Sequence, residues 1–475
     1  MSQKQLKSIS LYACSVVLMK GISLITLPLM AYYLSPAQLG QLELIGVTTM
    51  FVSLVIGLAM HENLYRFIGV IENEDEQKNK AAQLYSSTVT LSVSLSIALL
   101  GVYWLFPLHA ESIPTSAVYL IALVLCYEAP LAINLAWLRL KNKATLFFKV
   151  CVTTVIIQVA LLVVVLNLEP NVVVIFALNV LCTFGQYLFL HLKIGFKFSL
   201  PSYSQFKHYV SYSAPLMLSG VVAFGLSGAE RWIIAGTTDL ETLGMYAIAA
   251  KFALGVGILI QPFHMWWMPK RFDSMERFGA KHTAQITQQG IIVLCIIAVI
   301  VSWLSQVFIW FALPQAYKLA ASYVSLTICM MLFKELVEFT NFGILYKKQT
   351  SQLLVINVCA TLIAFAVCAT TIGLGIEAIL LSLVLGQVCR FIATYWRSQL
   401  LAPIQYQTAA VFGLVLLSTL FLVTSRYQQH VELSLLMLFL QPLALVAYAL
   451  RVKLLKASTF KNAYVVIQTY MGRTQ

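Results

Sequence analysis

Charged residues are scarce in this chain. Of its 475 residues only 10% are charged, fewer than the 12% that are aromatic, while 60% are hydrophobic. Soluble domains carry roughly 25% charged residues. The composition therefore excludes a water-soluble enzyme of two or three domains and indicates a polytopic membrane protein.

The sequence also lacks the motifs of several enzyme and metal-binding classes. No GxxxxGK[ST] phosphate-binding loop occurs and the loops are at most about 20 residues long, which excludes ATP hydrolysis by this chain. The nine cysteines all lie in apolar segments without CxxC spacing, so we expect no disulfide framework, no metal site and no cofactor. The first apolar stretch is too long for a signal peptide, and we expect it to remain as a membrane span.

Long apolar runs, by contrast, fill the chain. A helix needs about 20 apolar residues to cross a hydrocarbon core of about 30 Å. The runs are continuous, without the alternation that a membrane barrel requires. We therefore predict an all-α polytopic membrane protein with about 14 transmembrane helices. The predicted spans are residues 10–34, 40–60, 82–106, 117–138, 144–167, 171–192, 209–236, 243–268, 290–313, 319–346, 352–372, 374–396, 406–425 and 433–450.

The positive charge of the chain predicts its orientation. The net charge is +13, from 31 Lys and Arg against 18 Asp and Glu. With both termini in the cytoplasm, the inner segments hold 24 of these cations and the outer loops only Lys318 and Arg426. Cytoplasmic loops of membrane proteins are enriched in Lys and Arg. We therefore expect both termini inside, and we explain the basic charge by topology rather than by nucleic-acid binding.

A faint internal repeat divides the chain. The segment around Leu39 and Gly40 resembles the segment around Leu243 and Gly244, which follows about six spans later. Repeated six-helix halves are typical of alternating-access transporters. We predict an N-terminal six-helix bundle (1–200), a second six-helix bundle (201–400), and an additional helix pair with a cytoplasmic tail (401–475).

Four stretches carry a family resemblance: YYLSPAQLGQLEL, RFIGVIENEDEQKNK, GAERWIIAGTTDLETLGMYAIAAKFA and MWWMPKRF. The chain resembles the oligosaccharide (O-antigen repeat-unit) flippases, the polysaccharide-transporter branch of the multidrug/oligosaccharidyl-lipid/polysaccharide (MOP) exporter superfamily. The resemblance extends from the first span to the MWWMPKRF stretch, and the last third of the chain matches only in hydropathy. Members typically show Asp-Arg where this chain has Glu230-Arg231. The resemblance implies two bundles in a V-shaped alternating-access arrangement.

Charged residues also lie inside the predicted spans, and ten of them need an explanation. Each would cost about 2.5–3.5 kcal/mol or more at the bilayer centre if it faced lipid, so they must pair, line water or extend to the interface. The cations are Lys20, Arg231, Lys251, Lys334 and Arg390, and the acids are Glu43, Glu128, Glu230, Glu335 and Glu338.

Four of the cations are candidates for binding an anionic head group. Lys20 and Lys251 have no acid within a helical turn along the sequence, which favours a role in a central cavity. Lys334 can instead pair with Glu338 at i+4, and Arg231 can be a structural salt-bridge partner. Lysine and arginine at membrane depth suit phosphate or pyrophosphate. We therefore assign the substrate's pyrophosphate and head group to Lys20, Lys251, Lys334 and Arg231.

Three acids are candidates for coupling transport to an ion. Glu128 lies two residues before Pro130, where a helix break would free carbonyls to help coordinate a cation. Glu335 and Glu338 lie in the middle of the tenth span. A neutral, hydrogen-bonded glutamate is the alternative for Glu128. We also expect hinges at Pro28, Pro215 and Gly220, although Pro and Gly are frequent in membrane helices generally.

The resemblance supplies the substrate class. It implies that the chain is not an enzyme but flips undecaprenyl-pyrophosphate-linked oligosaccharides across the bacterial inner membrane by alternating access, coupled to H⁺ or Na⁺, for O-antigen or other surface polysaccharides. Expected partners are membrane lipids and the polymerase and chain-length regulator of the pathway, but no nucleic acid. The alternatives are a multidrug/cation antiporter of the same superfamily, a peptidoglycan lipid-precursor flippase, and a membrane-embedded polymerase or acyltransferase.

Overall fold

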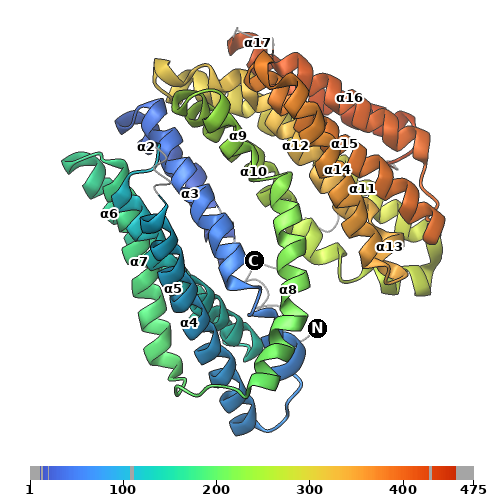
Figure 1. The fold of residues 1–475 in the computed structure, drawn as a ribbon. Coiled ribbons are helices and arrows are strands. Elements are labelled where there is room, and N and C mark those ends of the chain that lie inside the picture. Colours follow the sequence, from blue (N-terminus) through green and yellow to red (C-terminus); the bar gives the residue numbers. More distant parts are fainter. Residues whose placement is uncertain are drawn as a thin grey trace, which may run out of the picture. The chain divides into compact units, whose positions relative to one another are not determined.

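The computed structural model describes residues 11, 14, 15, 17–19, 21–106, 112–426 and 431–455 (Figure 1). This part of the chain is helical and contains no strand. The helices are α2 (Leu27–Tyr33), α3 (Pro36–Gly57), α4 (Glu74–Leu105), α5 (Thr115–Leu140), α6 (Ala144–Leu168), α7 (Val172–Ile194), α8 (Tyr203–Gly225), α9 (Glu230–Thr237), α10 (Leu240–Trp267), α11 (Arg271–Ala312), α12 (Ala320–Thr340), α13 (Phe342–Tyr346), α14 (Thr350–Thr371), α15 (Ile376–Leu401), α16 (Thr408–Arg426) and α17 (Val431–Arg451).

The number of membrane-crossing helices agrees with the sequence. Twelve of the described helices are long and apolar enough to cross a membrane, and the bent pair α8 and α9 raises this number to thirteen. A shorter apolar helix, Val17–Tyr33, precedes them. Each of the fourteen predicted stretches overlaps one of these helices or the bent pair. The prediction of an all-α membrane protein with about 14 spans is therefore confirmed.

Packing divides the chain into two compact units, residues 1–247 and 248–475. The boundary lies inside α10. In the second unit α16 and α17 both pack on α11. Trp303 Nε1 of α11 donates a hydrogen bond to Gln441 Oε1 of α17 at 2.7 Å. The boundaries drawn from the sequence at residues 200 and 400 stay a prediction.

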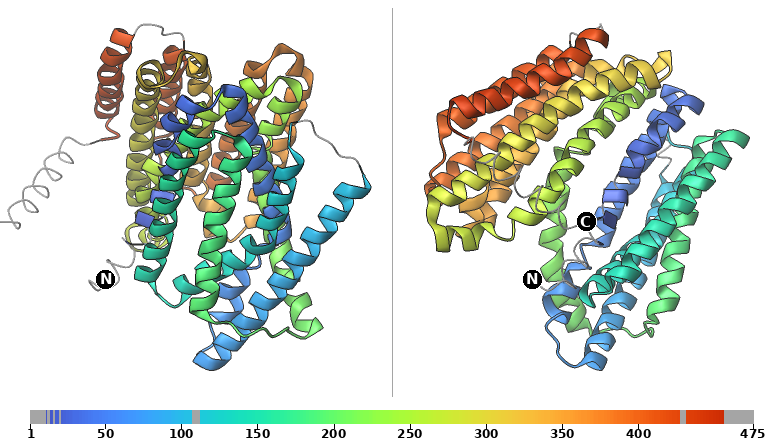
Figure 2. Two further views of the ribbon diagram at one scale, coloured as in Figure 1. Left: turned by 90° about the vertical axis from the view of Figure 1, so that its left-hand side faces the viewer. Right: turned by 180° about the vertical axis from the view of Figure 1, so that it is seen from behind.

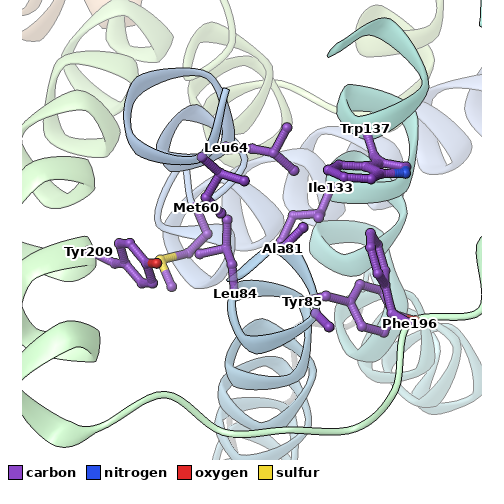
Figure 3. Packing of buried hydrophobic residues seen from close by; sticks show 11 residues of the cluster. Met60, Leu64, Ala81, Leu84, Tyr85, Ile133, Trp137, Phe196 and Tyr209 are labelled. Atoms are coloured by element: carbon purple, nitrogen blue, oxygen red, sulfur yellow. The ribbon is translucent and has the colours of Figure 1, made fainter. Parts of the chain in front are cut away.

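In the first unit, α5 is the central helix. It packs against α3, α4 and α7, and α6 lies along α7 (Figure 2). Where α3 ends, the chain turns through Leu58 and Ala59, which both have positive φ, and continues into a short π-helical turn, Leu64–Ile68. Apolar side chains from this turn, α4, α5 and α8 form one cluster, shown in Figure 3. This cluster anchors the turn between α3 and α4 by burying its apolar side chains.

The two glycines of the internal repeat lie against each other. A Cβ on Gly40 of α3 would be 1.8 Å from the carbonyl oxygen of Leu240 in α10. A Cβ on Gly244 would be 1.9 Å from the carbonyl oxygen of Pro36. Any side chain at either position would overlap backbone atoms of the other helix. The repeated Leu-Gly pairs are therefore the place where α3 and α10 approach at backbone distance.

The second unit is built around α12. This helix packs against α11, α15 and α16, and most of its side chains are buried. The long helix α11 contains a break at Gly279, whose φ of 78° only glycine adopts without strain. Because α12 has neighbours on several sides, its polar residues meet side chains of other helices in this unit.

Candidate functional site

Arg231 forms an ion-paired cluster within the first unit. Its Nε lies 2.7 Å from Glu43 Oε1 on α3, and its Nη1 lies 2.6 Å from Glu230 Oε1. The hydroxyl of Tyr246 on α10 donates a hydrogen bond to the same Glu230 oxygen at 2.9 Å. The guanidinium also lies 5.7 Å from the centre of the Tyr246 ring. One arginine therefore links α3, α9 and α10.

The cluster is largely hidden from solvent. Glu230 is 1% exposed and the Arg231 side chain 17%. Glu230 Oε2 is buried and has no hydrogen-bond partner among the described residues. Both carboxylates hold the guanidinium, which matches the structural alternative that we considered for Arg231. A role in substrate binding would require the head group to compete with these two acids.

Glu128 lies on the accessible side of α5. It accepts a hydrogen bond from the hydroxyl of Ser53 on α3. We expected a helix break beside Pro130, but α5 continues without interruption from Thr115 to Leu140. Proline lacks the amide that would bond to the carbonyl four residues earlier. The proline therefore leaves the carbonyl of Cys126 without its helical donor, although the helix stays intact.

Two glutamates of α12, Glu335 and Glu338, have polar contacts with residues of α10, α11 and the C-terminal end of α12 itself. Glu335 Oε2 lies 3.4 Å from Nδ1 of His264 on α10, and both side chains are mostly buried, at 14% and 16% exposed. Glu338 Oε2 accepts a hydrogen bond from Asn341 Nδ2 at 3.2 Å. Arg271 Nη1 of α11 donates to the Glu338 carbonyl oxygen at 3.1 Å. The structure thus brings Glu335 and Glu338 into one polar region.

His264 is a member of this region that the sequence analysis missed. Its other ring nitrogen, Nε2, is buried without a hydrogen-bond partner among the described residues. The Phe339 ring lies edge-on at 4.7 Å from the imidazole. The one signal in the sequence was a histidine near the end of an apolar span. Its partner Glu335 belongs to a helix further along the chain, so no helical periodicity connects the two residues.

The remaining cations inside the predicted spans differ in burial and in contacts. Lys251 on α10 and Lys334 on α12 are both half-buried in the second unit. Lys20 lies outside the described residues. Arg390, another of the cations inside the predicted spans, donates from Nε to Asn357 Oδ1 of α14 at 2.7 Å. The assignment of Lys20, Lys251, Lys334 and Arg231 to the substrate therefore stays a prediction.

The helix breaks do not all lie at the expected hinges. Pro28 is in the first turn of α2, directly after a bend at Thr26. Pro215 and Gly220 both lie inside the continuous helix α8. The 45° bend comes later, between Gly225 and Glu230. The hinge roles of these three residues stay predictions, and the bend itself places Arg231 at the start of the next helix.

The helical fold of this chain is similar to that of solved membrane transporters. The lipid II flippase MurJ in an inward closed conformation is 14% identical, covering 93% of this chain and 99% of that one, with a TM-score of 0.69. An inward-facing multidrug resistance MATE family transporter of the MOP superfamily is 13% identical, covering 84% and 99%, with a TM-score of 0.57. An outward-facing one is 14% identical, covering 86% and 97%, with a TM-score of 0.56. The chain therefore has the fold of MOP-superfamily membrane transporters.

The family follows from the sequence itself. The model of the family described as "Polysaccharide biosynthesis protein" matches residues 18–263, more than half of the chain. The protein belongs to this family, as the resemblance of its sequence motifs implied. No curated protein matches the sequence.

Proposed function

We propose that this protein flips undecaprenyl-pyrophosphate-linked oligosaccharide repeat units from the cytoplasmic to the periplasmic leaflet of the bacterial inner membrane. Membership of a polysaccharide biosynthesis family on a transporter fold is the observation that carries the proposal. The product would be O-antigen or another surface polysaccharide. Both termini would lie in the cytoplasm, on the side where the lipid-linked repeat unit is made.

The charges at membrane depth support an anionic substrate. Lys251 and Lys334 lie in apolar helices and are half-buried, so each ammonium is partly removed from water. Such a charge gains more from a phosphate oxygen than an exposed lysine does, because the surrounding dielectric is low. Together with Lys20 they would hold the pyrophosphate, while the polyprenyl chain stays in lipid. Arg231 would take part only if the substrate displaced Glu43 or Glu230.

The carboxylates would couple the cycle to H⁺ or Na⁺. Glu128, Glu335 and Glu338 remain our candidates, and His264 joins them because it lies 3.4 Å from Glu335. A carboxylate beside an imidazole can hold the ring in one tautomer and stabilise its protonated form. Uptake and release of an ion would change the net charge of this pair, and with it the electrostatic potential at the substrate's phosphates.

Deletion of the gene in the source bacterium tests the proposal. We expect loss of long-chain surface polysaccharide on a gel and accumulation of undecaprenyl-linked repeat units in lipid extracts. Complementation with Lys334→Gln should fail. The control variant Lys281→Gln, which changes an exposed lysine of α11, should restore the polysaccharide. Unchanged polysaccharide with altered sensitivity to cationic drugs would point to the antiporter. Accumulation of lipid II would point to the peptidoglycan precursor.

A further inference from the structure

A groove with a volume of about 540 Å³ runs between α6 and α7 in the first unit. Its walls include Lys149, Thr153 and Ile157 from α6 and Cys182, Gly185 and Phe189 from α7. None of the candidate substrate or coupling residues that the structure describes lines it. The groove is therefore a feature that the proposed transport site leaves unexplained.

The interior of the groove is suited to hydrocarbon. Apolar side chains make most of its surface, and the hydroxyl of Thr154 is already used, because it donates to the Val150 carbonyl at 2.9 Å. A Cβ on Gly185 would have no heavy atom within 4 Å, so the missing side chain contributes open space to the groove. From Lys149 to Leu161 the wall formed by α6 is about 18 Å long, at 1.5 Å per residue. That length accommodates a chain rather than a compact molecule.

One end of the groove is basic. Lys149 is exposed in its wall. Lys193 is also exposed and lies one helical turn beyond Phe189, on the same face of α7. Lys143, exposed as well, is the residue directly before α6. The opposite end is lined by Leu161 and Leu181. A chain in the groove would thus have its head at the lysines, on the side that the topology assigns to the cytoplasm.

We propose that this groove binds the single hydrocarbon chain of a polyprenyl phosphate carrier lipid, with its phosphate at Lys149 and Lys193. One groove accommodates one chain, whereas a glycerophospholipid has two. A terminal phosphate or pyrophosphate also carries more charge than a phosphodiester and matches several lysines better. The inference rests on the proposed function, since it gives the lipid-linked substrate a docking site on the outer surface of α6 and α7.

Binding of undecaprenyl phosphate to the purified full-length protein in detergent tests this site, measured by native mass spectrometry. Gly185→Leu fills the groove and should weaken binding by about tenfold, the effect of losing two buried methylene groups. Lys149→Gln should weaken it by about fivefold, the contribution of one lysine near a membrane surface. Gly101→Leu is the matched control, because a Cβ at Gly101 of α4 also meets no atom within 4 Å.

Thr153→Phe fills the groove from α6 instead of α7. It is a second test of the groove in case Gly185→Leu does not fold. Wild-type binding by both filled variants would overturn the proposal, and so would equal binding and full competition by phosphatidylglycerol. This measurement uses the free carrier lipid and needs no transport. Failure of the proposed function would instead appear as unchanged lipid-linked sugars in the deletion strain, whatever the binding result.

Discussion

Replacing Arg231 with glutamine should strongly destabilise the first unit. The guanidinium makes two charged hydrogen bonds, at 2.7 Å to Glu43 and 2.6 Å to Glu230. Each such bond contributes about 1.5–3 kcal/mol. Removing one partner of a buried ion pair costs about 3–5 kcal/mol, because the remaining charge stays buried without compensation. The two figures agree, and we expect a loss of about 3–5 kcal/mol in the free energy of unfolding.

Unfolding of the purified protein in detergent measures this loss. Arg231→Lys should recover only part of it, since one ammonium cannot occupy the positions of both Nε and Nη1. A triple variant with Glu43→Gln, Glu230→Gln and Arg231→Gln should be more stable than Arg231→Gln alone, because it buries no charge. Unfolding of Arg231→Gln at the wild-type midpoint, or a triple variant less stable than Arg231→Gln, would contradict a buried ion pair at this position.

Three further predictions address other sites. Lys20→Ala should abolish flipping without loss of folded protein, and normal accumulation of surface polysaccharide by this variant would remove Lys20 from the transport site. Gly40→Ala should reduce the yield of folded protein severely, because its Cβ would lie 1.8 Å from a backbone oxygen. The control Gly46→Ala should express normally, because a Cβ at Gly46 meets no atom within 4 Å. Equal yields of the two variants would contradict the close approach. Glu335→Gln and His264→Ala should each make lipid-linked sugar transport in vesicles insensitive to an imposed pH gradient, and a preserved response in both would leave proton coupling to other residues.

The spans could be predicted from the sequence because hydropathy is a local property. A run such as Val172–Ile194 has to be helical and to cross the membrane whatever its neighbours are, since its backbone polar groups must be satisfied within the segment. The positions of helix bends were harder to predict from the sequence. Pro215 and Pro130 lie within continuous helices, while the bend before Glu230 falls at residues 226–229, which contain no proline. Neighbouring helices can satisfy a carbonyl that proline leaves free, so proline alone does not mark a hinge.

The pairing of charges could be predicted only where both partners share a helix segment. Glu230 is adjacent to Arg231 in the sequence, but Glu43 is 188 residues away and Tyr246 lies on the next helix. The His264–Glu335 pair has the same character, because it joins α10 to α12. Which of several buried acids meets a given cation depends on helix packing, and composition or spacing contains no information about that choice.

The contact between α3 and α10 has the pattern of a two-fold symmetric interface. The same offset along the sequence separates Pro36 from Leu240 and Gly40 from Gly244, and the two close approaches are Gly40 to Leu240 and Gly244 to Pro36. In a two-fold symmetric dimer of identical half-length chains, residue 40 of each copy would meet residue 36 of the other. The single chain shows the same reciprocal pattern between the two copies of its Leu-Gly pair. One glycine at this position is thus enough, by symmetry, for a half-length chain to make both close approaches as a homodimer.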